Sequence, residues 1–446
     1  MSTLLTYYFS TTTAKCFYDL LDVSANSYLP LNRRTYIFAT LGKQTPWNTG
    51  LEVAPTPTQS IRDLTYYHDR AIVAKRISQE SASFVVPRVN WTANTVYKFA
   101  TCTTCPAGTP FYVLNSKDQV FKCLWNNNGI ASNNEPQLSL SSTSLEEPYF
   151  ETADGYKWKY LYTINSQEKQ KFLTADWMPV RNDRFVRASA VNRSIDIVRL
   201  INSGNNYVDG SSQDIITIDG DGSGAALKAN VSGGKVVDII IQNRGQNYTR
   251  ANLSFTDVSG GIGTGAEAAV TLSPQNGHGY DPIEELYANT IIFNVDFEGS
   301  ESGVFPVDNE YREVTLLKNP YEYGTTELAD AELYTMYTQI KTSPGVGDFN
   351  NDEIVYQGFS YENSTFSADV ISFDETQNIL YVNNVQGILN VNQPIKGYES
   401  GSIRVAINKI NPTLQLFSGK ILYIADKVPI ARDTDQTDTV RFILSF

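Results

Sequence analysis

The sequence is poor in cysteine, methionine and charged residues. It holds 4 Cys and 3 Met in 446 residues, and 19% of its residues are charged. Four cysteines are too few for a disulfide-built scaffold in a chain of this length. A run of about 18 apolar residues, the minimum for a membrane-spanning helix, is also absent. The first residues lack a basic segment followed by an unbroken apolar stretch, so no secretory signal is predicted.

Basic residues are outnumbered by acidic ones. The 35 Lys and Arg against 48 Asp and Glu give a formal net charge of −13. Proteins that bind nucleic acid or anionic membrane surfaces generally present clustered cations. The charge balance therefore predicts neither a nucleic-acid partner nor a membrane partner.

Aromatic residues, by contrast, are abundant. The chain has 27 Tyr and 21 Phe, and 41% of its residues are hydrophobic. Aromatic-rich, charge-poor composition favours β structure. Because single cores rarely grow beyond about 250–300 residues, a chain of this length is expected to form several domains. We predict a mostly β fold with a β-sandwich-like core, a few short helices and two small inserted β domains.

Local patterns place some of the elements. Ser60 followed by Asp63 fits the start of a capped helix, and residues 111–125 fit a hairpin. Tyr156, Trp158 and alternate residues after them share one side of a period-two segment, which indicates a strand with one buried face. Helices are predicted over residues 11–21, 60–78, 166–173 and 327–338, and strands over 154–164 and 438–446.

The stretch 198–275 is rich in Gly, Asn, Ser and Asp, and it contains a repeat. The sequence Gly-Asn-Asn-Tyr that ends at Tyr207 recurs as Gly-Gln-Asn-Tyr ending at Tyr248, an offset of 41 residues. The pair Gly222 and Gly224 recurs at the same offset as Gly263 and Gly265. Several features at one offset predict two copies of a small β unit that pack on each other.

A second unusual stretch, 326–412, carries strand-like runs punctuated by glycines after its predicted first helix. It is expected to form a small β barrel or meander. It holds 4 basic and 11 acidic residues, a net charge of −7, and 198–275 adds −2. Nine of the thirteen negative charges therefore lie in these two stretches, which we interpret as insertions into a core formed by 1–197, 276–325 and 413–446.

The segments outside the insertions resemble the baseplate wedge subunit encoded by gene eight of T-even-type contractile-tailed phages. Seven segments carry the resemblance in order and reach the last residue, which makes their combination more specific than any one of them. The segments are Ala39–Trp47, Phe84–Trp91, Asp154–Ile164, Tyr287–Phe297, Ser302–Pro320, Ser418–Ile430 and Asp435–Phe446.

The resemblance implies a structural role. Members of that family have sandwich-like β domains, form homodimers, contact other baseplate wedge proteins and rearrange when the tail sheath contracts, with no known enzymatic activity. It implies synthesis in the host cytoplasm, a place in the virion's tail baseplate, and no cofactor. Trp47, Tyr156 and Trp158 are aromatic residues of the matching segments and are candidates for interface contacts, against the alternative that they pack in the core.

The insertions leave a second function open. Small β domains on phage tail proteins can bind glycans, so a receptor- or glycan-binding tail protein is the alternative, with a host glycan bound only through the insertions. A groove in an insertion lined by coplanar exposed aromatic rings would favour this alternative. An enzyme is not predicted, because the two histidines, His68 and His278, have no GxSxG elbow to accompany them.

Two motifs resemble metal sites. Cys102 and Cys105 form a CxxC pair followed by Cys123, but a structural zinc site generally needs a fourth ligand, and ordinary thiols are the alternative. Asp219 and Asp221 alternate with glycines as in a calcium loop. Their counterparts in the second repeat copy are Gly260 and Ile262, which favours a turn. No metal is therefore predicted.

Overall fold

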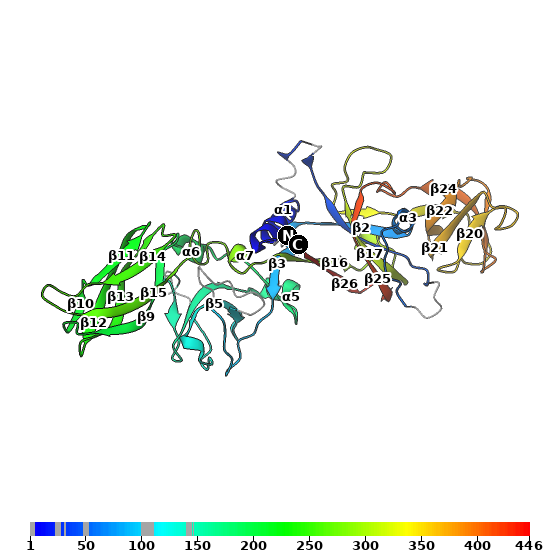
Figure 1. Ribbon diagram of the computed structural model, residues 1–446. Helices are drawn as coiled ribbons and strands as arrows, with labels where there is room; N and C mark the ends of the chain where they lie inside the picture. Colours follow the sequence, from blue (N-terminus) through cyan, green and yellow to red (C-terminus); the bar gives the residue numbers. More distant parts are fainter. Residues whose placement is uncertain are drawn as a thin grey trace. The chain divides into compact units, whose positions relative to one another are not determined.

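The computed structural model describes residues 5–22, 28–30, 33–47, 53–99, 111–139, 145 and 147–446. Strands dominate it, which confirms the mostly β expectation (Figure 1). In the described part of the chain, no helix is long and apolar enough to cross a bilayer. The chain divides into two compact units: unit 1 is Met1–Ala14, Phe84–Thr290 and Ser445–Phe446, and unit 2 is Lys15–Ser83 and Ile291–Leu444.

This division differs from the single discontinuous core that the sequence led us to expect. Residues of 1–197, 276–325 and 413–446 fall in both units, and each unit has a hydrophobic cluster of its own. Helix α1 (Tyr7–Asp19) lies near the start of the chain and extends four residues before the predicted range.

Unit 2 is built around a five-stranded sheet. Its order is β18-β2-β1-β17-β25, and every neighbouring pair is antiparallel. All six residues of β1 are buried, as expected for the central strand of a covered sheet. The bounds are β1 Ile37–Gly42, β2 Ala71–Ile77, β17 Asn309–Lys318, β18 Leu333–Thr335 and β25 Lys420–Arg432; the unit also holds β16 (Thr290–Glu298) and β26 (Thr437–Ser445), the latter at the predicted position.

Of two helix predictions in unit 2, one gave a helix that was too long and the other was wrong. Helix α3 begins after Ser60, whose Oγ accepts a hydrogen bond from the Asp63 amide at 3.1 Å, but it covers only Ile61–Asp69. The remainder of 60–78 is β2, because pairing with β1 outweighs its helical periodicity. The range 327–338 holds β18 instead of a helix, since Leu333–Thr335 extends the sheet beside β2.

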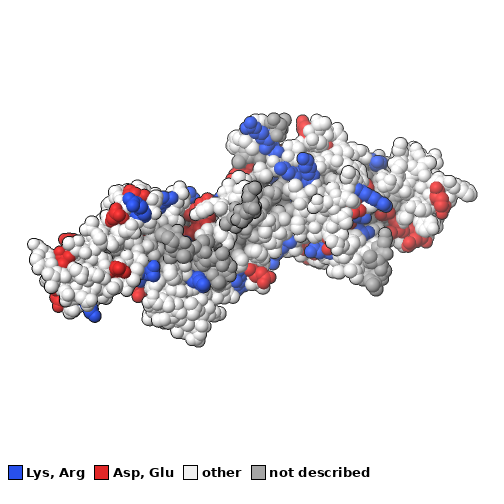
Figure 2. Space-filling view, viewed as in Figure 1, with Lys and Arg blue, Asp and Glu red and all other residues white. Residues whose placement is uncertain are grey.

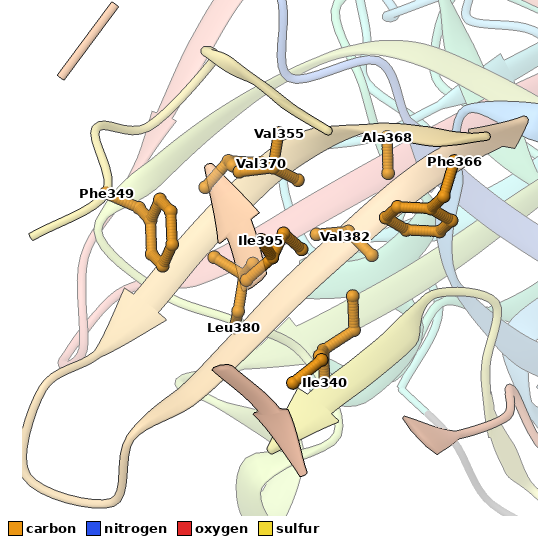
Figure 3. Packing of buried hydrophobic residues seen from close by; sticks show 10 residues of the cluster. Ile340, Phe349, Val355, Phe366, Ala368, Val370, Leu380, Val382 and Ile395 are labelled. Atoms are coloured by element: carbon orange, nitrogen blue, oxygen red, sulfur yellow. The ribbon is translucent and has the colours of Figure 1, made fainter. Parts of the chain in front are cut away.

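The stretch 326–412 contains a closed six-stranded barrel. Its order is β19-β22-β21-β20-β23-β24, and pairing of β24 with β19 closes it. Ten buried apolar residues fill its interior, among them Phe366, Val382 and Ile395, which point toward one another (Figure 3). Figure 2 shows acidic side chains on its surface. The strands are β19 Thr338–Thr342, β20 Ile354–Gln357, β21 Phe366–Asp374, β22 Ile379–Gly387, β23 Pro394–Gly397 and β24 Ile403–Ile410.

Unit 1 contains a four-stranded aromatic sheet of order β4-β5-β7-β6. The predicted hairpin is confirmed, since β4 pairs with β5 in antiparallel register. The predicted third helix is confirmed as α5, where Asn165 and Glu168 form a reciprocal capping box. The bounds are β3 Ala82–Pro87, β4 Tyr112–Leu114, β5 Gln119–Asn126, β6 Phe150–Glu151, β7 Tyr156–Thr163, α5 Ser166–Phe172, β8 Trp177–Pro179, α6 Arg184–Ser189 and α7 Pro282–Glu285.

The two repeat copies in unit 1 exchange strands. The first strand of each copy pairs with the last strand of the other: β9 with β15, and β13 with β12. A shorter pair, β11 with β14, also joins the copies. The strands are β9 Ile195–Asn205, β10 Gly210–Gln213, β11 Ile216–Gly220, β12 Ser223–Ser232, β13 Lys235–Gln246, β14 Ala251–Phe255 and β15 Thr264–Leu272.

The repeated residues meet across the copies. The Tyr207 ring lies where a Cβ on Gly263 would be, and the Tyr248 ring lies where a Cβ on Gly222 would be. The spacing of 41 is therefore the signature of a reciprocal tyrosine–glycine contact, because each buried ring needs a residue without a side chain beneath it.

Asp221 in the first repeat copy forms hydrogen bonds to the second copy. Its carboxylate accepts hydrogen bonds from the backbone amides of Thr249 and Arg250 at 2.8 and 3.0 Å. The hydrogen bond from the Thr249 hydroxyl, together with these backbone bonds, holds the pKa of the Asp221 carboxyl well below its usual range. Asp221 therefore lies in the bend after β11 and is engaged by these contacts, whereas Asp219 lies within β11, so the turn interpretation holds for Asp221 only.

Candidate functional site

The three aromatic residues proposed for interfaces lie inside the chain. Tyr156 and Trp158 are fully buried and stacked, with ring centroids 5.4 Å apart. Trp47 is also buried, and its Nε1 donates to the Lys427 carbonyl at 2.9 Å. The interface expectation for these residues is therefore corrected to core packing, because side chains without exposed surface have little to offer a partner.

The cysteine motif falls largely outside the described residues, which include neither Cys102 nor Cys105. Cys123 is buried in β5, and burial raises the pKa of its thiol. Its Sγ lies 3.5 Å from the Trp125 carbonyl oxygen, to which it donates. Among the described residues no group of three or more His, Cys, Asp or Glu is arranged to hold a metal ion.

The two histidines have separate surroundings. His68 on α3 is half-buried beside the Phe417 ring, and burial lowers the pKa of its imidazole. His278 belongs to a buried charge network that also contains Lys122, Glu285 and Asp196. His278 Nδ1 pairs with Glu285, so the imidazole is engaged structurally.

A polar pocket in unit 2 is the strongest candidate for a functional site. Its volume is about 350 Å³. It lies where β1 ends against the turn between α3 and β2, and a side chain at Gly42 would strike the Arg70 backbone there. The residues that define this polar pocket come from the end of β1, the segment before α3, α3 itself, β17 and β25: Lys43, Trp47, Pro55, Thr56, Pro57, Thr58, Asp63, Tyr66, Tyr67, Arg70, Glu313 and Asp426.

Two carboxylates form one side of the polar pocket. Glu313 on β17 and Asp426 on β25 are directly opposite each other in the antiparallel register. Like charges in such a pair oppose strand pairing. Arg70 Nη2 lies 2.6 Å from Glu313 Oε1, and Tyr67 donates to Asp426 at 3.1 Å. The repulsion between these two adjacent carboxylates is therefore offset only in part, by Arg70 and Tyr67.

Burial shapes the charge states of these groups. The Glu313 side chain is 2% exposed, and burial, with a smaller contribution from Asp426, raises its pKa to about 7 against the opposing effect of Arg70. Burial likewise raises the pKa of Asp426 and lowers that of Lys43. A carboxyl group that titrates near neutrality inside a pocket is typical of functional sites.

Sequence reasoning missed the polar pocket. Glu313 and Asp426 lie in two of the seven resembling segments, but nothing local indicates that they face each other. Only the register of β17 against β25 brings them together. The one available signal was an acidic residue at an otherwise apolar position of each strand.

A second hollow, of about 790 Å³, lies near Arg34, Lys318 and Lys420. Its lining side chains are largely at the surface, and it lacks the buried charged groups of the polar pocket. It is the larger of the two hollows but the weaker candidate for a functional site.

Comparison with protein-family models and with curated protein sequences found no match.

Proposed function

We propose that this chain is a structural component of a contractile-tail baseplate wedge, without enzymatic activity, which acts by dimerising and by contacting other wedge proteins. The observation that carries the proposal is the placement of the seven resembling segments. Each overlaps or contains a strand of the structure: β1, β3, β7, β16, β17, β25 and β26. Three of them, β1, β17 and β25, are neighbours in one sheet although they are distant in sequence.

The long strand β25 offers a surface suited to assembly. It ends the order of its sheet in the described part of the chain, and it spans 13 residues. Leu422 and Val428 on it are 43% and 61% exposed. Long edge strands with exposed apolar residues are templates for pairing with another chain, which supports a role carried by surface contacts.

The purified chain is expected to have twice its 49.7 kDa mass by light scattering. Val428→Glu should shift it toward the monomer, because a charge would be buried at the edge of β25. Ile262→Glu, at an exposed site in the repeat, is the matched control and should leave the mass unchanged. A wild-type monomer would contradict the dimerisation part of the proposal.

One observation favours the glycan-binding alternative for the barrel. Tyr361 lies between Tyr356 and Tyr398, with ring centroids 6.2 and 5.5 Å away. Phe359 in the same loop is 95% exposed. The rings are edge-to-face, at interplanar angles of 69° and 62°, so they do not form the expected coplanar platform, but each exposed ring is suited to stacking on one sugar ring.

Binding to a glycan array is the measurement for this alternative. The double variant Tyr361→Ala, Tyr398→Ala should reduce a bound signal at least about tenfold if two stacking contacts are lost. Tyr323→Ala, an exposed tyrosine outside the barrel, is the control. Absence of any wild-type signal across the array would remove this second function.

A further inference from the structure

The polar pocket has unused capacity to accept hydrogen bonds. Glu313 Oε1 faces Arg70 Nη2, but Glu313 Oε2 is buried without a hydrogen-bond partner in the described structure. Both oxygens of Asp426 share the single Tyr67 hydroxyl proton, at 3.1 and 3.2 Å. Carboxylate oxygens accept several hydrogen bonds each, so the two acids can take further donors.

The cations of the polar pocket are already engaged. Lys43 Nζ donates to Thr45 Oγ1 at 2.9 Å and to the Pro46 carbonyl at 3.2 Å, and it lies over the Trp47 ring. The Arg70 guanidinium pairs with Glu313 and lies over the rings of Tyr66 and Tyr67. An incoming anion would have to displace these contacts, whereas an incoming cation would meet free acceptors.

The formal charge of the polar pocket also favours a cation over an anion. Three acids, Asp63, Glu313 and Asp426, line the polar pocket against Lys43 and Arg70, which leaves an excess of one negative charge when all are ionised. The direct opposition of Glu313 and Asp426 costs strand stability in the empty pocket. A single positive charge between them would remove that repulsion.

The walls suit a chain of methylene groups. Pro55 and Pro57 provide exposed apolar surface around the polar floor. A volume of about 350 Å³ accepts one long side chain and leaves little room for a larger group.

We propose that the polar pocket binds the side chain of a lysine presented by a partner protein, with its ammonium group between Glu313 and Asp426. A lysine fits better than an arginine, because a compact ammonium with three donors occupies the space beside the Arg70 guanidinium. The inference rests on the proposed function, because the lysine would belong to another wedge protein that contacts this chain.

Binding should depend on pH. The groups that face Glu313 are Lys43 at the end of β1, Tyr67 and Arg70 at the end of α3, and Asp426 on β25. Since the pKa of Glu313 is about 7, its ionised fraction is about tenfold greater at pH 8 than at pH 6. Only the ionised form attracts an ammonium group, so affinity should rise about tenfold between these pH values.

The probe is Nα-acetyl-lysine methylamide, measured against the purified chain by saturation-transfer NMR. The expected result is binding at pH 8 that is about tenfold weaker at pH 6. The Nε-acetylated form of the probe, which lacks the charge, should not bind. Glu313→Gln and Asp426→Asn should each abolish binding, while Glu375→Gln, at an exposed position of the same unit, should leave it unchanged.

Circular dichroism of each variant establishes that it is folded, and Asp426→Asn keeps the test decisive if Glu313→Gln unfolds. No binding by the wild type at pH 8, equal binding of the acetylated probe, or retained binding in folded Glu313→Gln or Asp426→Asn would overturn the proposal. Because the assay uses the chain alone, its failure is separate from failure of wedge assembly, which is measured with the partner proteins present.

Discussion

Glu285→Ala is expected to lower the free energy of unfolding of unit 1 by about 3–5 kcal/mol, the usual cost of removing one partner of a buried ion pair. Glu285 accepts from Lys122 Nζ at 2.9 Å and from the Gly279 amide at 2.7 Å, and it pairs with His278. The substitution would leave the buried Lys122 ammonium without its partner. Urea unfolding followed by circular dichroism measures the change.

Glu285 should also make the stability of unit 1 depend on pH. Burial alone would raise the pKa of Glu285, but Lys122 and His278 outweigh it and hold the pKa well below its usual value. A depressed pKa stabilises the fold above the unfolded-state value of 4.5, and this stability is lost as the pH falls below it. Wild-type stability should therefore drop on acidification from pH 5, and the drop should be smaller in Glu285→Gln.

Glu284→Ala is the matched control, because Glu284 is an exposed acid on the same short helix, α7. It should change stability by no more than about 0.5 kcal/mol. The double variant Lys122→Met, Glu285→Leu should be more stable than Glu285→Ala, since no charge is left buried and unpaired. Equal destabilisation by Glu284→Ala and Glu285→Ala would contradict the role of the network.

Trp158→Ala is expected to cost about 3–5 kcal/mol, as is typical of large aromatic residues removed from a core. Trp158 is fully buried between Tyr156, stacked at 5.4 Å, and Tyr97, edge-on at 5.7 Å. The cavity left by the indole would also remove both aromatic contacts. Thermal or urea unfolding of unit 1 reports the loss.

Two further variants sharpen this result. Trp158 Nε1 is buried without a hydrogen-bond partner in the described structure, so Trp158→Phe removes an unsatisfied donor and should cost much less than Trp158→Ala. Phe185→Ala, at an exposed position of α6 in the same unit, should change stability by less than about 0.5 kcal/mol. A loss below about 1 kcal/mol for Trp158→Ala would contradict its place in the core.

Elements with local determinants could be predicted from the sequence. The α5 helix follows from the Asn165 and Glu168 capping pair, and β7 from its alternating aromatic residues. The repeat was visible because Tyr207 and Tyr248 recur with their glycines. That each tyrosine packs on the glycine of the other copy was not visible, since spacing alone does not say which copies exchange strands.

Features that depend on tertiary pairing were missed. The range 60–78 shows helical periodicity from Ile61 to Ile72, yet β2 begins at Ala71, because pairing with β1 and β18 outweighs that periodicity. Trp47 was proposed for an interface and is instead covered by contacts within the chain, including its bond to Lys427. The polar pocket was missed for the same reason, since Glu313 and Asp426 meet only through strand register.

The most direct test of the proposed wedge function is co-expression of the chain with the proteins encoded by the neighbouring genes, followed by size-exclusion chromatography. The proposal predicts that tail and baseplate proteins are among those neighbours and that the chain co-elutes with them in one stable complex. If those proteins assemble without it and the chain elutes alone as a 49.7 kDa monomer, the proposal is contradicted.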